Sequence, residues 1–306
     1  MLRGHKQIKK LWQRLASGIF VPNGYESNCS RSDSESYLQM KEKAEQLELL
    51  YKEVGVVIPD GSGLALLIES AKQLSDSWLI NGAESVSDTV LFRAAHLNRV
   101  SDAILTLRSD TDTAFHLEKL TEGSLDLLER DQSVAKNFLW ELELLHVLRV
   151  HDVEAELREP PDIVANFEGS SIGIACKKVY SEKNVEKVLS KGVSQIEQEY
   201  EFGILAVNID DLVPAGSLLK AKTQQDMAEN ISALNLQFLR KHERHFRKYL
   251  ETGRVLSALV STSVLADVQN GDVRLNNARQ SSVWMIPGLS EDKAAVFNNF
   301  YTKIMQ

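Results

Sequence analysis

The spacing of apolar residues predicts helices in the first part of the chain. In residues 34–130, apolar side chains recur every three or four positions between charged ones, which is typical of amphipathic helices. Residues 3–20 interleave basic and apolar side chains, a pattern that indicates a short basic amphipathic helix. Residues 1–130 are therefore expected to be a helical N-terminal region. Its expected helices cover residues 34–54, 64–80, 86–107 and 115–128.

The pattern changes after residue 130, where helices alternate with short apolar runs of strand length. We expect helices over residues 136–150, around Gln195, and over 224–250 and 292–304. We expect strands over residues 153–157, 162–167, 171–177, 203–209, 255–264 and 282–286. Residues 131–306 are thus predicted to be an α/β (α+β) domain with a central mixed sheet, following the helical region.

Composition is that of an ordinary globular protein. The chain has 306 residues, a length that suits two domains. No apolar run approaches the roughly 18–20 residues of a membrane span, and the basic N-terminus lacks the apolar core of a secretory signal. Cys29 and Cys176 are the only cysteines and do not suggest a disulfide framework, so we expect a cytoplasmic protein without membrane contact. The net charge of −8 argues against indiscriminate coating of nucleic acid but leaves room for a local basic groove.

The most informative stretch lies between residues 141 and 195. Asp162 follows a proline pair at the start of one expected strand, and Lys177 stands near the end of the next, with turn residues 168–170 between them. Side chains alternate along a strand, so the acid and the lysine are expected on one face. An acid of this kind suits a divalent cation, and a nearby lysine can orient a water or offset charge on a phosphate. The spacing therefore indicates a metal and phosphate site.

The order of these residues resembles the PD-(D/E)XK nuclease superfamily, the restriction-endonuclease-like proteins, over about residues 131–210. Pro161-Asp162 is similar to the PD element, Lys177 to the motif lysine, and Gln195 to a glutamine on the following helix. The resemblance implies an αβββαβ core and assigns Asp162 as a metal ligand. It also implies that the backbone carbonyl of Cys176 is a ligand to Mg²⁺ or Mn²⁺.

The resemblance further implies a glutamate on the helix before the first strand. Glu141 and Glu143 both qualify. They stand about 200° apart around the helix, so only one of them can face the sheet. Either would be a catalytic residue, and we expect Glu143 to ligate the metal as well.

One departure from the family pattern concerns Ala175. The chain reads Ala175-Cys176-Lys177 where the family has an acid two residues before the lysine. Three accounts stay open. The alanine silences an enzyme by replacing its catalytic glutamate, it marks a natural member that binds without cutting, or another acid, Glu168 or Glu182, enters the site.

Basic residues near the motif suggest contact with nucleic acid. Four lysines follow the motif lysine and are candidates for phosphate contacts: Lys178, Lys183, Lys187 and Lys191. The last three recur every fourth residue, which places them on one helical face. Residues 240–248 form the most basic stretch of the chain. A solvated helix face, with the lysines balanced by Glu182 and Glu186, explains the same pattern without nucleic acid.

Two functions follow from these observations. The first is a metal-dependent nuclease, that is, a hydrolase acting on DNA or RNA. Ala175 either inactivates this enzyme or does not. Bacterial defence is one setting in which such a protein would act. The alternative is a catalytically dead binding or assembly protein with a nuclease fold. In both, residues 1–130 would bind a protein partner or the substrate, or form a homo-oligomer.

Overall fold

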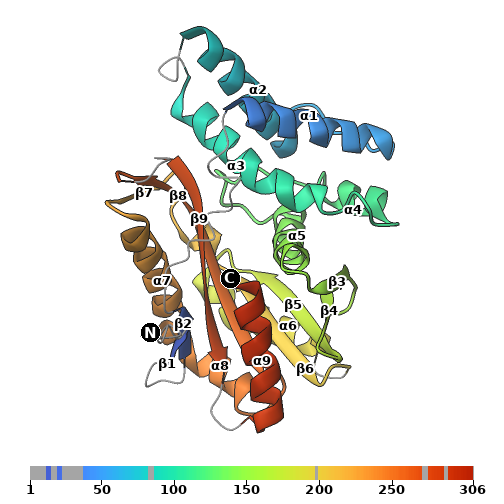
Figure 1. The fold of residues 1–306 in the computed structure, drawn as a ribbon, viewed down its shortest axis with the longest axis vertical. Helices are drawn as coiled ribbons and strands as arrows, with labels where there is room; N and C mark the ends of the chain where they lie inside the picture. Colours follow the sequence, from blue (N-terminus) through green and yellow to red (C-terminus); the bar gives the residue numbers. More distant parts are fainter. Residues whose placement is uncertain are drawn as a thin grey trace, which may run out of the picture.

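The structure, a computed structural model, describes residues 12–14, 19–22, 37–81, 86–196, 199–270, 275–285 and 289–305. It confirms a mixed α/β protein in which helices precede a mixed sheet interleaved with further helices. The helices of the first half gather above the sheet, and α5 (Val134–Val150) lies between the two (Figure 1).

The helices before the sheet largely follow the predicted periodicity. They are α1 (Tyr37–Glu53), α2 (Gly63–Asn81), α3 (Asp88–Leu105) and α4 (Thr113–Lys119). Ser87 caps α3 by accepting a hydrogen bond from the backbone N–H of Val90, which satisfies one of the free donors of the first turn. The helix expected over residues 115–128 ends much earlier, at Lys119, and turns connect it to α5.

The order αβββαβ, expected from the sequence, is present. After α5 come β3 (Glu154–Leu157), β4 (Ile163–Phe167), β5 (Ser170–Lys178), α6 (Val185–Ile196) and β6 (Phe202–Asn208). Strands β3, β4 and β5 pair antiparallel, and β6 pairs parallel with β5. The β4–β5 hairpin turns at Glu168 and Gly169, and Gly169 has φ 79°, a conformation that glycine adopts without strain.

The rest of the chain extends the sheet beyond β6. It adds β7 (Leu218–Ala221), α7 (Gln224–Lys241), α8 (Glu243–Leu250), β8 (Ser257–Val268), β9 (Leu275–Met285) and α9 (Glu291–Ile304). The path through the sheet is β1-β2-β9-β8-β6-β5-β4-β3, with β7 beside β8. The short strand β7 was not expected. The helix expected over residues 224–250 is broken at His242.

The prediction for the N-terminus was wrong in the part that the structure describes. Instead of a helix, β1 (Trp12–Arg14) and β2 (Ile19–Pro22) form a hairpin, and β2 pairs with β9 (Figure 1). An edge strand such as β9 presents unpaired backbone groups, and pairing with them overrides a weak helical pattern. Residues 1–130 are therefore not all helical. Cys29 and the other residues of 1–11, 15–18 and 23–36 lie outside the described residues.

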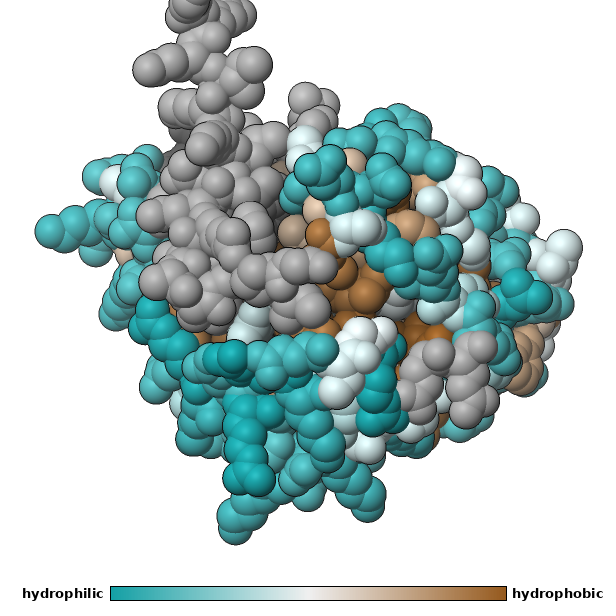
Figure 2. Space-filling view, turned by 90° about the horizontal axis from the view of Figure 1, so that it is seen from below, coloured by the Kyte–Doolittle hydropathy of each residue, from teal (hydrophilic) through white to brown (hydrophobic). Residues whose placement is uncertain are grey.

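The largest apolar core is continuous between the helices and the sheet. It runs from Leu47 in α1 through Leu142 in α5 to Ile163 in β4 and Phe300 in α9. The boundary at residue 130 stays a prediction, and the two halves share buried side chains across it. Seen from below, apolar side chains are visible between hydrophilic ones (Figure 2). Among the described helices, none combines the length and apolarity needed to cross a bilayer.

Candidate functional site

The structure brings Asp162, Lys177 and Gln195 together at one end of the β4–β5 hairpin. Asp162 immediately precedes β4 and is only 7% exposed. Its Oδ2 accepts hydrogen bonds from Lys177 Nζ at 2.7 Å and from the backbone N–H of Cys176 at 2.6 Å. Its Oδ1 accepts a hydrogen bond from Gln195 Nε2, on α6, at 3.2 Å. We call these residues, with Glu141, the Asp162 site.

The ammonium of Lys177 joins two oxygens of this site. In addition to Asp162 Oδ2, Lys177 Nζ donates to the carbonyl oxygen of Cys176 at 2.9 Å. These are the oxygens that the resemblance assigns to a metal ion, so they do converge on one cation. Gly192 on α6 makes room for Leu205 and for the lysine, because a Cβ there would lie 2.5 Å from Leu205 Cδ1 and 3.1 Å from Lys177 Cγ.

Glu141 and Glu143 have entirely different surroundings. Glu141 is partly buried and interacts electrostatically with Asp162 and Lys177. Burial and then the negative charge of Asp162 raise its pKa well above the ordinary value. Glu143 instead forms ion pairs with Arg99 and Arg279 and is 3% exposed. Glu143 therefore does not belong to the Asp162 site, because arginines hold both of its carboxylate oxygens. Glu141 does belong to it.

Position 175 lies in an apolar environment. Ala175 is fully buried and belongs to the same apolar cluster as Val193 of α6 and Leu205 of β6. The two acids proposed to replace a ligand there are engaged elsewhere. Glu168 accepts hydrogen bonds from Asn299, at 3.1 and 3.2 Å, and Glu182 pairs with Lys241. These contacts do not support the account in which another acid enters the site.

The donor atoms of the Asp162 site suit a hard divalent cation. Two carboxylates, Asp162 and Glu141, interact electrostatically, and burial raises the pKa of Asp162 despite the opposing charge of Lys177. With the Cys176 carbonyl they offer three oxygen-bearing groups, and Mg²⁺ commonly takes one or two carboxylates with water and phosphate in its other positions. Within the described residues no group of three or more acidic, histidine or cysteine side chains is arranged to hold a metal ion, and position 175 is the place where the resemblance has a further acid.

The four lysines expected to contact nucleic acid divide into two kinds. Lys178 is buried, pairs with Asp211 at 2.7 Å and donates to Asn208 Oδ1 at 2.7 Å. Its side chain is only 4% exposed, so it does not share a surface with the other three, and its contact with nucleic acid stays a prediction. The other three are exposed, on α6 and on the 3₁₀ turn before it: Lys183, Lys187 and Lys191.

The acids near these exposed lysines point to other partners. Glu182 pairs with Lys241, and Glu186 pairs with Lys248 at 3.5 Å. Among the described residues, Lys183, Lys187 and Lys191 have no recorded ion pair. The reading in which Glu182 and Glu186 balance the three lysines therefore does not match the observed pairing.

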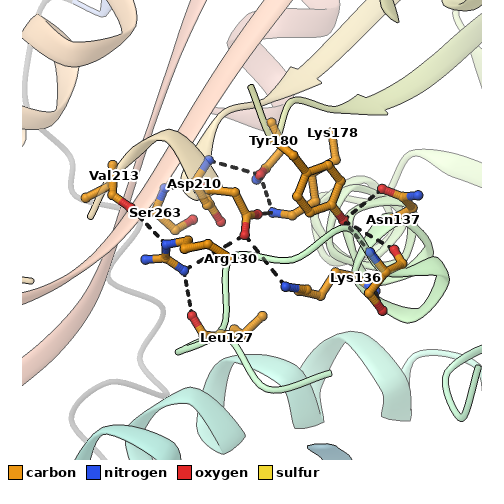
Figure 3. Close-up of polar contacts among 12 residues, drawn as sticks. Leu127, Arg130, Lys136, Asn137, Lys178, Tyr180, Asp210, Val213 and Ser263 are labelled. Carbon is orange, nitrogen blue, oxygen red and sulfur yellow. Dashed lines mark hydrogen bonds and ion pairs between the residues drawn. The ribbon is translucent and has the colours of Figure 1, made fainter. Parts of the chain in front are cut away.

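A second polar cluster surrounds Lys178 (Figure 3). The carboxylate of Asp211 joins the cations of this cluster. Its oxygens lie 2.7 Å from the amine of Lys178, 3.7 Å from that of Lys136 and 4.0 Å from the guanidinium of Arg130. Arg130 also donates to the backbone carbonyl of Val213 at 2.8 Å, which ties the segment before α5 to the segment after β6. The sequence did not reveal this cluster. Its one signal is the pair of acids, Asp210 and Asp211, directly after an apolar strand.

A buried ion network connects the helices to this cluster. Arg99 of α3 bonds Glu143 of α5 and reaches Asp210 Oδ2 at 2.6 Å, while Asp210 Oδ1 accepts from the backbone N–H of Ser263 at 2.7 Å. Burial alone would raise the pKa of Glu143 and Asp210. The charges of Arg279 and Arg99 outweigh burial, so both pKa values lie below the ordinary range. The network therefore holds these carboxylates ionised.

His96, beside this network, makes stability depend on pH. Burial, and next the charge of Arg99, lower its pKa to about 3. The unfolded side chain takes up a proton near its ordinary pKa of about 6.5 while the folded one does not, so folding weakens as the pH falls from about 6.5 towards 3. We expect His96 alone to lower the free energy of unfolding by about 2 kcal/mol at pH 5. Urea unfolding at pH 7 and at pH 5 measures this loss of stability. The His96→Gln variant should lose less free energy of unfolding between the two pH values than the parent chain; an equal loss would contradict the assignment.

Comparison with known proteins identifies no matching family model, no matching curated protein and no matching solved structure.

Proposed function

We propose that this chain is a nuclease-type protein whose Asp162 site acts on the phosphodiester backbone of DNA or RNA with Mg²⁺ or Mn²⁺. The observation that carries the proposal is the contact of Lys177 Nζ with both Asp162 Oδ2 and the Cys176 carbonyl, at 2.7 and 2.9 Å. The order αβββαβ supports it, since these residues stand at the positions that the PD-(D/E)XK resemblance assigns to them.

Each side chain of the site has a role that its contacts support. Asp162, Glu141 and the Cys176 carbonyl would hold the cation, which polarises a phosphate and readies a water for attack. Lys177 would move from Asp162 towards that water or the phosphate, where an ammonium offsets developing negative charge. Gln195 keeps Asp162 oriented through its hydrogen bond to Oδ1. A cation would also relieve the repulsion between the two carboxylates.

A basic face extends from this site along α6. Lys191 precedes Gln195 by one helical turn and Lys187 precedes Lys191 by another, so their side chains follow one side of the helix, and Lys183 lies in the 3₁₀ turn just before it. Ion pairs from Glu186 to Lys248 and from Glu182 to Lys241 place the basic end of α7 and helix α8 alongside. Exposed lysines in such a row suit the charge of a nucleic-acid backbone.

The second candidate is binding without cleavage. Ala175 favours it, because no carboxylate is available at that position and the side chain is enclosed by apolar neighbours. In this case the Lys177 ammonium takes the place of the metal permanently, and the site serves to recognise the nucleic acid or to assemble with a partner.

A cleavage assay tests the proposal. The chain and its Ala175→Glu and Ala175→Asp variants are incubated with plasmid, linear DNA and RNA in the presence of Mg²⁺ or Mn²⁺. We expect metal-dependent cleavage by at least one of the acidic variants. Ala175→Gln is the matched control for size, and Asp162→Ala in the acidic background is the control for chemistry; both should be inactive.

The outcomes separate the two candidates. Cleavage by an acidic variant that is lost with Asp162→Ala supports the nuclease site and identifies Ala175 as the silencing residue. If every variant retains the circular dichroism of the parent and none cleaves, the nuclease proposal fails. Retained affinity for DNA or RNA in the parent chain would then favour the binding protein.

A further inference from the structure

A second site lies on the other face of β5 from Asp162. Lys177 and Lys178 are consecutive residues of this strand, so their side chains leave on opposite faces. Lys178 lines a cavity of about 40 Å³ whose walls also include His96 and Arg99 of α3, Arg130, and Asp211. The cavity therefore lies where the helices meet the sheet, and the exposed residues Gly216 and Ser217 lie at its rim.

The charges around this cavity do not balance among the described residues. The ion pairs that join Arg99 to Glu143 and Asp210, and Lys178 to Asp211, belong to one buried group. That group holds five cations, Arg99, Arg130, Lys136, Lys178 and Arg279, and three carboxylates, Glu143, Asp210 and Asp211. Two positive charges are left over. Lys136 and Arg279 do not line the cavity, and the side chain of Arg130 is 30% exposed, so the excess belongs to the ion network as a whole. Burying unpaired charge is costly, and a bound dianion would compensate it.

Two polar atoms facing the cavity have no hydrogen-bond partner among the described residues. They are His96 Nδ1 and Asp211 Oδ1, in residues that are 8% and 7% exposed. Asp211 Oδ1 has only the longer ion-pair contacts of Lys136, at 3.7 Å, and Arg130, at 4.0 Å. A buried carboxylate oxygen needs a donor, and Arg99, Arg130 and Lys178 keep N–H donors beyond the bonds that they already make. A ligand that fits must therefore both accept several hydrogen bonds and donate at least one.

Phosphate meets these requirements. One water molecule needs about 10–15 Å³ of cavity volume measured in this way. The cavity of about 40 Å³ therefore has room for about three water-sized groups, which is close to the size of a phosphate. We propose that this cavity binds free inorganic phosphate as its dianion, which keeps one hydroxyl. Arg99, Arg130 and Lys178 face its oxygens, and its hydroxyl donates to Asp211. Sulfate has the same charge and shape at neutral pH but no proton to donate.

The ligand would act as a bridge between the two halves of the chain. It would join α3, which carries His96 and Arg99, to the end of β5, which carries Lys178. Binding is therefore expected to raise the thermal stability of the whole chain. The proposal does not depend on catalysis at the Asp162 site, because neither Asp162 nor Lys177 takes part in it.

Thermal unfolding and calorimetric titration of the full chain test the proposal. Sodium phosphate, sodium sulfate and sodium chloride are compared at equal ionic strength and neutral pH. Arg130→Gln removes one cation of the cavity, and Arg130→Lys keeps the charge in case the first variant is too unstable to measure. Arg108→Gln is the matched control, since Arg108 is exposed and lies away from the cavity.

We expect saturable stabilisation by phosphate, with sulfate binding at least tenfold more weakly because it lacks a donor for Asp211. Arg130→Gln should weaken phosphate binding at least tenfold, Arg130→Lys less, and Arg108→Gln not at all. Equal effects of phosphate, sulfate and chloride, or unchanged binding in Arg130→Gln, would overturn the proposal. A nucleoside 5′-monophosphate, whose phosphate dianion has no hydroxyl, should also bind at least tenfold more weakly than free phosphate; binding as tight as that of free phosphate would contradict the hydroxyl contact with Asp211.

Discussion

Replacing Glu143 with alanine is expected to lower the free energy of unfolding by about 3–5 kcal/mol. The change leaves Arg99 and Arg279 largely buried, with side chains 12% and 16% exposed, and without the carboxylate that both contact. Removing one partner of a buried ion pair is costly because it leaves the other charge uncompensated. Urea unfolding followed by circular dichroism measures the loss.

Glu141→Ala is the matched comparison, two residues away on the same helix. Burial and the charge of Asp162 already disfavour its ionised form, so its removal is expected to leave the stability unchanged or to raise it. Glu143→Gln keeps the shape of the side chain and should fall between the two alanine variants. A large loss from Glu141→Ala together with a negligible one from Glu143→Ala would reverse our assignment of the two glutamates.

Neutralising the exposed lysines of the α6 side is expected to weaken nucleic-acid binding at least tenfold at 0.1 M salt. The variant carries glutamine at the three positions, Lys183, Lys187 and Lys191. If each lysine contacts one phosphate of a duplex, the slope of log affinity against log salt should fall in magnitude by about 2.7. Fluorescence anisotropy with labelled DNA and RNA in EDTA measures binding without cleavage.

The control for this prediction has the same change of charge at other exposed lysines. Lys52, Lys220 and Lys222 lie outside α6, and their replacement by glutamine should leave both affinity and salt slope nearly unchanged. Equal losses in the two triple variants would show that the effect comes from net charge and not from a binding face. No loss in either would remove the support that α6 gives to the proposed function.

Local sequence signals were sufficient for the center of the fold. Alternating apolar residues and the turn at Gly169 predicted β4 and β5, and the pairing of these strands brings Asp162 beside Lys177. Gln195 could be placed near them because α6 must return to the sheet to begin β6. The arrangement follows from contacts close in sequence, which is why period and spacing predicted it.

Contacts distant in sequence account for the differences. Strand β2 pairs with β9, near the other end of the chain, and β1 pairs with β2; no local pattern signals the pairing with β9. Helical periodicity shows that Glu141 and Glu143 lie on different faces of the helix. Only the positions of Arg99 and Arg279 show that Glu143 is the one that faces away from the Asp162 site. Lys178 looks like a surface lysine in sequence, since its partner Asp211 comes from a later segment.

The most direct test of the central claim is a titration with Mn²⁺, monitored by the electron paramagnetic resonance signal of the free ion. The claim is that Asp162, Glu141 and the Cys176 carbonyl form a cation site to which an acid at position 175 adds a ligand. We predict saturable binding by Ala175→Glu, at least tenfold tighter than by the parent chain, and its loss in both Asp162→Ala and Glu141→Ala made in that background. Binding that is absent in Ala175→Glu, or unchanged when Asp162 is removed, would contradict the account.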